Sequence, residues 1–286
     1  MKKTINSISE QFWLRKFSEA TPDYQFPWYG EDRALTSVTR PLPTDVSAGV
    51  QKITKGNEKS EFVFYTAALS LCISRYCHLR EVTICTVANE EVLPLHIPVK
   101  DQNTYQEHLK HTGSIYLEAL NYTDYSFEEF LGKLNLRIGS DHSKVLKKVL
   151  FTVGKVPALI AEHFEMVINL RKEGSEVFLD VLYWDHLEHR AIFDGFMESL
   201  LGIIANTKSL LAIDLAKVSV LSSEQIFQVT ELFNAGYKAH PEATFLQLFS
   251  EHVSTQPDQV ALIYKEDEVS YKTLDERSNA VASRLL

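Results

Sequence analysis

Residues 189–195 read HRAIFDG and place His189 five positions before Asp194 and Gly195. A histidine near a carboxylate suits general-base catalysis, because a neutral imidazole can accept a proton near pH 7. Arg190 follows His189 directly and cannot take that role, since arginine keeps its proton in proteins. The segment is therefore either a catalytic motif with one working residue replaced, or a helix that happens to have a similar sequence.

The spacing of the apolar residues favours the helix. They recur at helical intervals and predict an amphipathic helix over about residues 189–205: Phe193, Phe196, Met197, Leu200, Ile203 and Ile204. On such a helix His189 and Asp194 would point about 140° apart, so they could not form one site. We therefore expect no catalytic residue in this chain, with His189 and Asp194 as disfavoured candidates.

The other histidines do not predict a metal site. His108 and His111 lie three residues apart beside Glu107, without a further carboxylate or histidine at ligand spacing. This pattern predicts a solvated helix face. The same interpretation applies to His186 and His189, so no metal site is expected.

Carboxylates and thiols also predict structural roles. Asp124, Glu128 and Glu129 could suggest paired catalytic carboxylates, but Ser126 followed three residues later by Glu129 is the pattern of a helix capping box. The three cysteines form no CxxC pair and predict inert core thiols in a reducing compartment: Cys72, Cys77 and Cys85.

Composition limits the possible partners. Apolar residues make up 45 % of the 286-residue chain and charged residues 23 %, which is ordinary for a globular protein. The net charge of −9 disfavours nucleic acid and anionic membranes as partners. No apolar run reaches the roughly 18 residues of a membrane span. The first residues lack the apolar core of a signal peptide, so we expect a cytoplasmic protein.

The pattern of elements predicts an α/β sandwich, in which helices cover a sheet with some antiparallel pairing. Strands are expected in 81–88, 92–99, 147–154, 163–172 and 176–184, the last two joined by a turn at KEGSE. Helices are expected in 61–76, in 126–134, in 222–236 and on one face formed by Tyr105, Leu109, Thr112, Tyr116 and Ala119.

The pattern changes after Gly236. Residues 237–244 predict a linker, followed by a helix from Phe245 and by a hairpin with its turn at Lys265–Asp267. A last helix, from Leu274, keeps its apolar stripe up to Leu286 and has no stop signal. We therefore expect the natural polypeptide to continue beyond this residue.

This C-terminal part resembles the opening of an adenylation domain of nonribosomal peptide synthetases. That family has a helix, then TPDAVAL, then LTYxELNxRANxLAxxL. Here Gln256-Pro257-Asp258 and Val269-Ser270-Tyr271 stand at the corresponding positions, with Thr273 in place of the usual Glu. Asp275, Arg277, Asn279 and Ala282 continue the match.

Residues 12–232 resemble the C-terminal lobe of a condensation domain of the same family. FWLRKFSEATPDYQFP is similar to YWxxxLxGxPxxLxLP, AALSLCISRYC to AALAxLLSRYS, and LPLHI to LPLRV. NYTDYSFEEFL, SDHSKVLKKVLF and DLAKVSVLSSEQ are looser versions of later family motifs. The family's catalytic HHxxxDG loop belongs to the first lobe, which this chain lacks, and 189–195 aligns instead with the final strand and helix. The loop ending in GxFVNT is also reduced, to Glu90, Glu91 and Val92.

The resemblance implies a single lobe of a chloramphenicol-acetyltransferase-like sandwich in 1–222, a linker in 223–243, and the start of an adenylate-forming domain in 244–286. It implies the N-terminal part of a peptide synthetase, an initiation module for an antibiotic or siderophore-like product, inactive alone and structural in role. ATP, Mg²⁺ and phosphopantetheine would serve the complete synthetase, with no cofactor on this chain. The implied partners are the rest of the adenylation domain and a carrier domain in cis, with another synthetase subunit as a further candidate. Two alternatives remain: a docking module that another chain completes, and a free-standing acyltransferase that uses His189.

Overall fold

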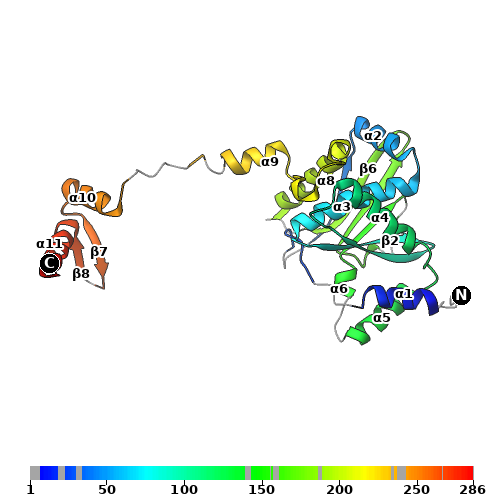
Figure 1. The fold of residues 1–286 in the computed structure, drawn as a ribbon, viewed down its shortest axis with the longest axis horizontal. Coiled ribbons are helices and arrows are strands. Elements are labelled where there is room, and N and C mark those ends of the chain that lie inside the picture. The colour runs from blue at the N-terminus through cyan, green and yellow to red at the C-terminus, as the bar shows by residue number, and fades with distance from the viewer. Residues whose placement is uncertain are drawn as a thin grey trace. The chain divides into compact units, whose positions relative to one another are not determined.

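The computed structural model describes residues 7–18, 23–29, 34–138, 143–154, 156, 161–185, 189–232, 235–236, 243–265 and 267–285. The chain divides into two compact units, Met1–Phe227 and Gln228–Leu286. Figure 1 shows the elements of both units. Among the described helices, none is long and apolar enough to cross a membrane.

The larger unit is built on one six-stranded sheet, in the order β1-β6-β5-β4-β2-β3. Its strands are β1 (Ala34–Pro41), β2 (Glu81–Ala88), β3 (Glu91–Pro98), β4 (Val149–Val153), β5 (Met166–Glu173) and β6 (Glu176–Asp185). Strand β4 runs parallel to both β5 and β2, and the other neighbours are antiparallel. Gly174 has φ +60°, the left-handed conformation that the tight β5–β6 turn requires.

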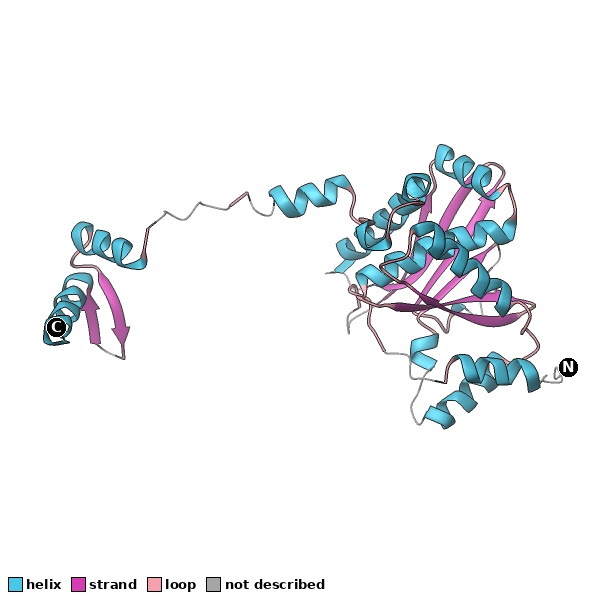
Figure 2. Ribbon diagram, in the orientation of Figure 1, coloured by secondary structure: helices cyan, strands magenta, loops and turns pink. Residues whose placement is uncertain are grey.

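Helices lie on both faces of this sheet (Figure 2). One layer contains α2 (Thr44–Thr54), α3 (Glu58–Tyr76), α4 (Tyr105–Ala119) and α8 (Arg190–Leu210). The other face carries α1 (Ser7–Lys16), α5 (Phe127–Ile138) and α6 (Ser143–Leu146), near β2 and β3. The short helices η2 (Leu215–Lys217) and α9 (Ser223–Phe227) follow α8.

Aromatic side chains join the last strand to the last long helix. Phe193 of α8 is fully buried and stacks on Tyr183 of β6, with ring centroids 3.5 Å apart. Trp28 packs edge-on against the Phe193 ring, with the two ring centroids 5.4 Å apart. The α8 stripe predicted from spacing is therefore the face that covers the sheet.

Most sequence expectations for the larger unit are confirmed. The α/β architecture, the buried helix, the β5–β6 hairpin and the α4 face agree with the structure, and α8 runs five residues further than expected. The helix expected over 222–236 is shorter in α geometry: it ends at Phe227 and continues as the π-helical η3 (Gln228–Leu232). Its predicted cap is present, since Ser222 and Gln225 exchange side chain–backbone hydrogen bonds.

The smaller unit contains α10 (Phe245–Thr255), β7 (Val260–Tyr264), β8 (Asp267–Ser270) and α11 (Tyr271–Leu285). The last helix begins three residues earlier than expected, because the Ser270 hydroxyl accepts a hydrogen bond from the Thr273 amide. None of the described residues in these four elements is buried. Its side chains are exposed or half-buried, and Phe249 of α10 packs against Tyr271 of α11.

We predict that Phe193→Ala lowers the free energy of unfolding of the larger unit by about 3–5 kcal/mol, because it leaves a cavity beside Tyr183 and Trp28. Urea unfolding followed by tryptophan fluorescence measures this unit alone, since Trp13, Trp28 and Trp184 all belong to it. The exposed Phe227 provides the matched control, Phe227→Ala, which should change the free energy by less than about 0.5 kcal/mol. Equal losses in the two variants would contradict the packing of Phe193 between Tyr183 and Trp28.

Candidate functional site

The HRAIFDG segment forms the start of α8. His189 is the residue before the helix, and Arg190 is its first residue. Asp194 faces β1, where its Oδ1 lies 2.8 Å from Nη2 of Arg40. The carboxylate that would orient a catalytic histidine therefore pairs with the sheet edge. His186, which the sequence pairs with His189, lies outside the described residues.

Gly195 has a packing role in the same segment. Its carbonyl oxygen accepts hydrogen bonds from Gln225 Nε2 at 3.2 Å and from Ser199 Oγ at 2.9 Å. A Cβ at this position would lie 3.2 Å from Gln225 Nε2 and 3.6 Å from the Tyr76 hydroxyl. The Asp-Gly pair thus joins α8 to β1 on one side and to α9 on the other, as a helical structural element would.

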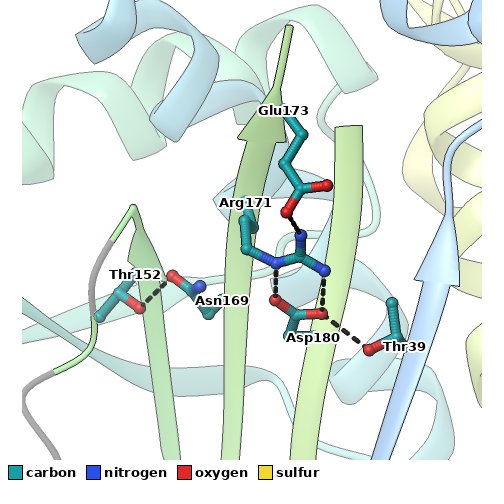
Figure 3. Close-up of polar contacts among 6 residues, drawn as sticks. All are labelled: Thr39, Thr152, Asn169, Arg171, Glu173 and Asp180. Atoms are coloured by element: carbon teal, nitrogen blue, oxygen red, sulfur yellow. Dashed lines mark hydrogen bonds and ion pairs between the residues drawn. The ribbon is translucent and has the colours of Figure 1, made fainter. Parts of the chain in front are cut away.

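A row of polar side chains crosses four strands on the sheet face opposite α3 (Figure 3). Register places Thr39 of β1 beside Asp180 of β6, Asp180 beside Asn169 of β5, and Asn169 beside Thr152 of β4. We call these four residues the polar row. Thr152 donates to Asn169 Oδ1 at 3.0 Å, and Thr39 donates to Asp180 Oδ1 at 2.8 Å.

Arg171 fixes the charge state of this row. It donates from Nε to Asp180 Oδ2 at 2.6 Å and from Nη2 to Oδ1 at 3.1 Å, and it also pairs with Glu173. The Arg171 hydrogen bonds and charge, helped by the Thr39 hydroxyl, hold the pKa of Asp180 below its usual value. Asp180 therefore stays ionised and is a poor proton acceptor at neutral pH.

A pocket of about 250 Å³ opens beside the polar row. Asn169 and Asp180 supply its polar wall, and the apolar side chains of Val167 and Leu182 lie around them. The Asn169 Oδ1 is occupied by Thr152, so its amide nitrogen is the group left to donate. This arrangement can hold and orient a polar group, and Ser37 adds a hydroxyl to its lining.

Sequence comparison places the chain near large synthetases, although no family model matches it. It is 21% identical over 312 aligned residues to bacitracin synthase 1 of Bacillus licheniformis, covering 97% of this chain. Tyrocidine synthase 3 of Brevibacillus parabrevis is also 21% identical, with 96% of this chain covered. The chain spans only 6% and 5% of the length of these two relatives.

Solved structures establish the fold. A four-domain nonribosomal peptide synthetase bound to AMP and glycine matches 98% of this chain and 25% of its own, with a TM-score of 0.70 at 12% identity. The condensation domain of a monacolin K polyketide synthase covers 73% of this chain and 58% of its own, with a TM-score of 0.57 at 13% identity. The larger unit is condensation-domain-like. The X-domain from teicoplanin biosynthesis, solved in complex with OxyB, has the same fold: TM-score 0.59, 13% identity, and 76% and 56% of the two chains covered.

One histidine of this condensation-domain-like unit lies where the sequence did not predict it. The solvated-face interpretation is correct for Glu107 and His111, which are exposed, but wrong for His108, which is buried. His108 Nε2 lies 2.9 Å from Ser70 Oγ and 3.3 Å from the Ala67 carbonyl oxygen of α3. Burial lowers the pKa of His108 to about 4, so its imidazole is neutral at pH 7.

The remaining candidates are structural in the described residues. Glu128 pairs with Lys147, and the Ser126 hydroxyl accepts a hydrogen bond from the Glu129 amide, which is the backbone half of the expected capping box. Burial raises the pKa of all three thiols, that of Cys77 to about 12, which keeps them protonated and poorly nucleophilic. No group of three potential metal ligands is found in the part of the chain that the structure describes.

The polar row is the arrangement that the sequence analysis missed. Its signal was present as the two-residue spacing of Asn169 and Arg171 in β5, opposite Asp180 in an alternating β6. Such spacing assigns side chains to one strand face but does not show which residues of other strands lie beside them. The register of β1 and β4 was needed to bring Thr39 and Thr152 into the row.

We predict that the larger unit loses stability as the pH falls from about 6.5 towards 4, because the pKa of His108 is lower in the folded state than in the unfolded chain. In that interval the unfolded chain binds the extra proton, so acid favours unfolding. Between pH 7.5 and 5.0 the loss should be about 2 kcal/mol. Urea unfolding followed by tryptophan fluorescence at the two pH values measures it.

Two glutamine variants test the origin of this pH dependence. His108→Gln should be less stable than the wild type at pH 7.5 but should show a flatter pH dependence. His111→Gln, at an exposed position of the same helix, should keep the wild-type dependence. If His108→Gln retains the full loss between the two pH values, the buried neutral imidazole is not its source.

Proposed function

We propose that this chain is part of a nonribosomal peptide synthetase that makes a peptide natural product. In this proposal residues 1–222 are a condensation-domain-like lobe, 223–243 are a linker, and 244–286 begin an adenylation domain. The observation that carries it is the continuity of the match: the synthetases for bacitracin, tyrocidine and gramicidin S align with 96–99% of this chain, across both units. If the chain shared only the fold of the lobe with these synthetases, the sequence match would not be expected to continue through the smaller unit.

We infer that the lobe acts by packing and positioning rather than by catalysis. The Asp-Gly pair of its motif-like segment is used to fix α8 against β1 and α9. The polar row offers a carboxylate whose pKa is held low by Arg171, so it is a weak base at neutral pH. Any condensation chemistry would need a histidine from another segment, in the same polypeptide or in a second chain.

The exposed surface of the smaller unit supports its assignment to a larger domain. Large apolar side chains are exposed on α10, β7 and α11: Phe245, Leu246, Leu262, Ile263, Tyr264, Val281 and Leu285. A two-stranded hairpin with two helices is marginal by itself, because it buries too little apolar area. The remainder of an adenylation domain would cover this surface.

ATP, Mg²⁺ and phosphopantetheine belong, in this proposal, to the complete synthetase. The described residues do not gather a set of potential metal ligands. The Gly- and Ser/Thr-rich phosphate loop of adenylation domains has no counterpart in the sequence. No step of their chemistry is therefore assigned to residues of this chain.

A second candidate function is docking of a partner protein. The observation that favours it is the X-domain, which shares this fold and was solved in complex with OxyB. A lobe that recruits a second chain would use its surface in the same general way and would also need no catalytic residue.

We predict that the longer polypeptide that carries this chain and continues through the adenylation domain catalyses amino-acid-dependent exchange of pyrophosphate into ATP. Removal of residues 1–222 should lower the exchange rate or the yield of soluble protein. In this proposal, the lobe covers apolar surface of the adenylation domain and anchors the linker. His189→Ala should leave the rate unchanged. Exchange assays with a panel of amino acids measure both variants against the wild type.

Each alternative gives a different result. No exchange with any amino acid would contradict the synthetase assignment, and unchanged behaviour after the deletion would contradict the packing role. Acyl transfer that disappears in His189→Ala would show that the lobe is a free-standing acyltransferase.

A further inference from the structure

Two apolar grooves lie side by side on the helical layer of the larger unit. The first, of about 410 Å³, runs between α2, α3 and α4 and is lined by Val63, Leu109, Tyr116 and Leu117 among others. The second, of about 470 Å³, runs between α2 and α8 and is lined by Val46, Val50, Ile204 and Leu211 among others. Neither groove contains residues of the HRAIFDG segment or of the polar row.

The end of α2 forms a ridge between the two grooves. Ile53 and Phe64 line both of them; Phe64 is buried, whereas Ile53 is 44% exposed. Leu117, 53% exposed, stands on the α4 wall of the first groove. A single acyl chain would fill only one groove. A ligand that occupies both grooves needs at least two apolar groups, one on each side of Ile53.

Lysines surround these grooves. Lys59 and Lys110 line the first groove, Lys52 and Lys208 line the second, and Lys55 ends α2. All five are exposed, and none takes part in an ion pair among the residues that the structure describes. Several lysines of other surfaces are paired: Lys16 with Glu118, Lys133 with Glu10, and Lys147 with Glu128.

This concentration of positive charge is unusual in a chain of net charge −9. Asp45 lies on the wall of the second groove and Glu58 begins α3, so the lysines outnumber the carboxylates at the rim. A third, polar depression of about 390 Å³ continues from Lys110 across α4 and contains Lys100, His111 and one carboxylate, Glu107. The complementary ligand is therefore apolar at its centre and anionic at its edges.

We propose that this face, which we call the lysine-rimmed face, docks an acidic amphipathic helix of a partner protein. Apolar side chains of that helix, one turn apart, would enter the two grooves on either side of Ile53, and its carboxylates would meet the lysines. This is a helix-in-groove mode of recognition. A protein fits better than an anionic membrane, since the apolar groups here line depressions, whereas a membrane surface needs protruding ones.

The test uses the full 286-residue chain and a labelled helical peptide of about 16 residues, with leucines at i, i+3, i+4 and i+7 and glutamates at the other positions. Fluorescence anisotropy should show saturable binding that weakens as salt is raised, because the rim contacts are exposed charge pairs. A peptide of the same composition in scrambled order, and one with lysines in place of the glutamates, should not bind.

Charge reversal locates the site. Lys59→Glu and Lys110→Glu should each weaken the peptide's affinity by about tenfold at low salt, since each replaces an attraction with a repulsion. Lys144→Glu makes the same charge change on α6, on the other side of the sheet, and should leave the affinity unchanged (Figure 1). The lysine peptide should bind the Lys59→Glu, Lys110→Glu double variant. Unaltered tryptophan fluorescence in all variants confirms that the larger unit is folded.

Several results would overturn the proposal. These are no binding of the acidic peptide, equal binding of the scrambled peptide, or an equal loss of affinity in Lys144→Glu. Binding of phosphatidylglycerol vesicles with the same lysine dependence, in the absence of peptide binding, would assign the face to a membrane instead. The assay has no catalytic readout, so its outcome is independent of the proposed function.

Discussion

Helix α3 is buried over most of its length, and the buried polar groups that it carries determine which elements can lie beside it. Ser70 donates to the Ala67 carbonyl oxygen and also meets His108 of α4. Glu61, buried near the start of the helix, pairs with Lys172 of β5. A buried polar group without a partner costs about 1–3 kcal/mol, so each of these contacts fixes the position of a neighbour. The helix therefore orients α4 and β5 around it.

The two faces of the sheet carry different kinds of side chain. The face toward α3 is filled by large apolar side chains, with Phe193 of α8 stacked on Tyr183. The opposite face keeps the polar row and a small pocket, where Arg171 holds Asp180 ionised. The groups of the polar row form hydrogen bonds and ion pairs, and Asp180 stays ionised at neutral pH. Under the proposed function, the described residues of this unit serve packing and positioning.

Sequence patterns predicted those parts of the fold that depend on local periodicity. Helix α3 and the β5–β6 hairpin have strong signals, an apolar run and a glycine turn, and both are present as expected. Strand β1 has no such signal, because it is an edge strand in which Thr36 and Ser37 interrupt the alternation, and it obtains its structure from pairing with β6. His108 shows the limit for single residues: its spacing from His111 places both on α4 but does not show that α3 covers only one of them. The polar row depends on strand order and register, which no single segment contains.

The two units also differ in what keeps them folded. The larger unit has a continuous core, so its helices and strands are held by the packing of their own side chains. In the smaller unit the described residues have no buried side chain, although α10 is capped by Thr244 and Gln247 and the hairpin is regular. Caps and backbone hydrogen bonds fix local geometry, but net stability in water comes mainly from apolar burial. The smaller unit thus has the local structure of a domain without its core. Under the proposed function, the remainder of the adenylation domain packs against its exposed apolar side chains.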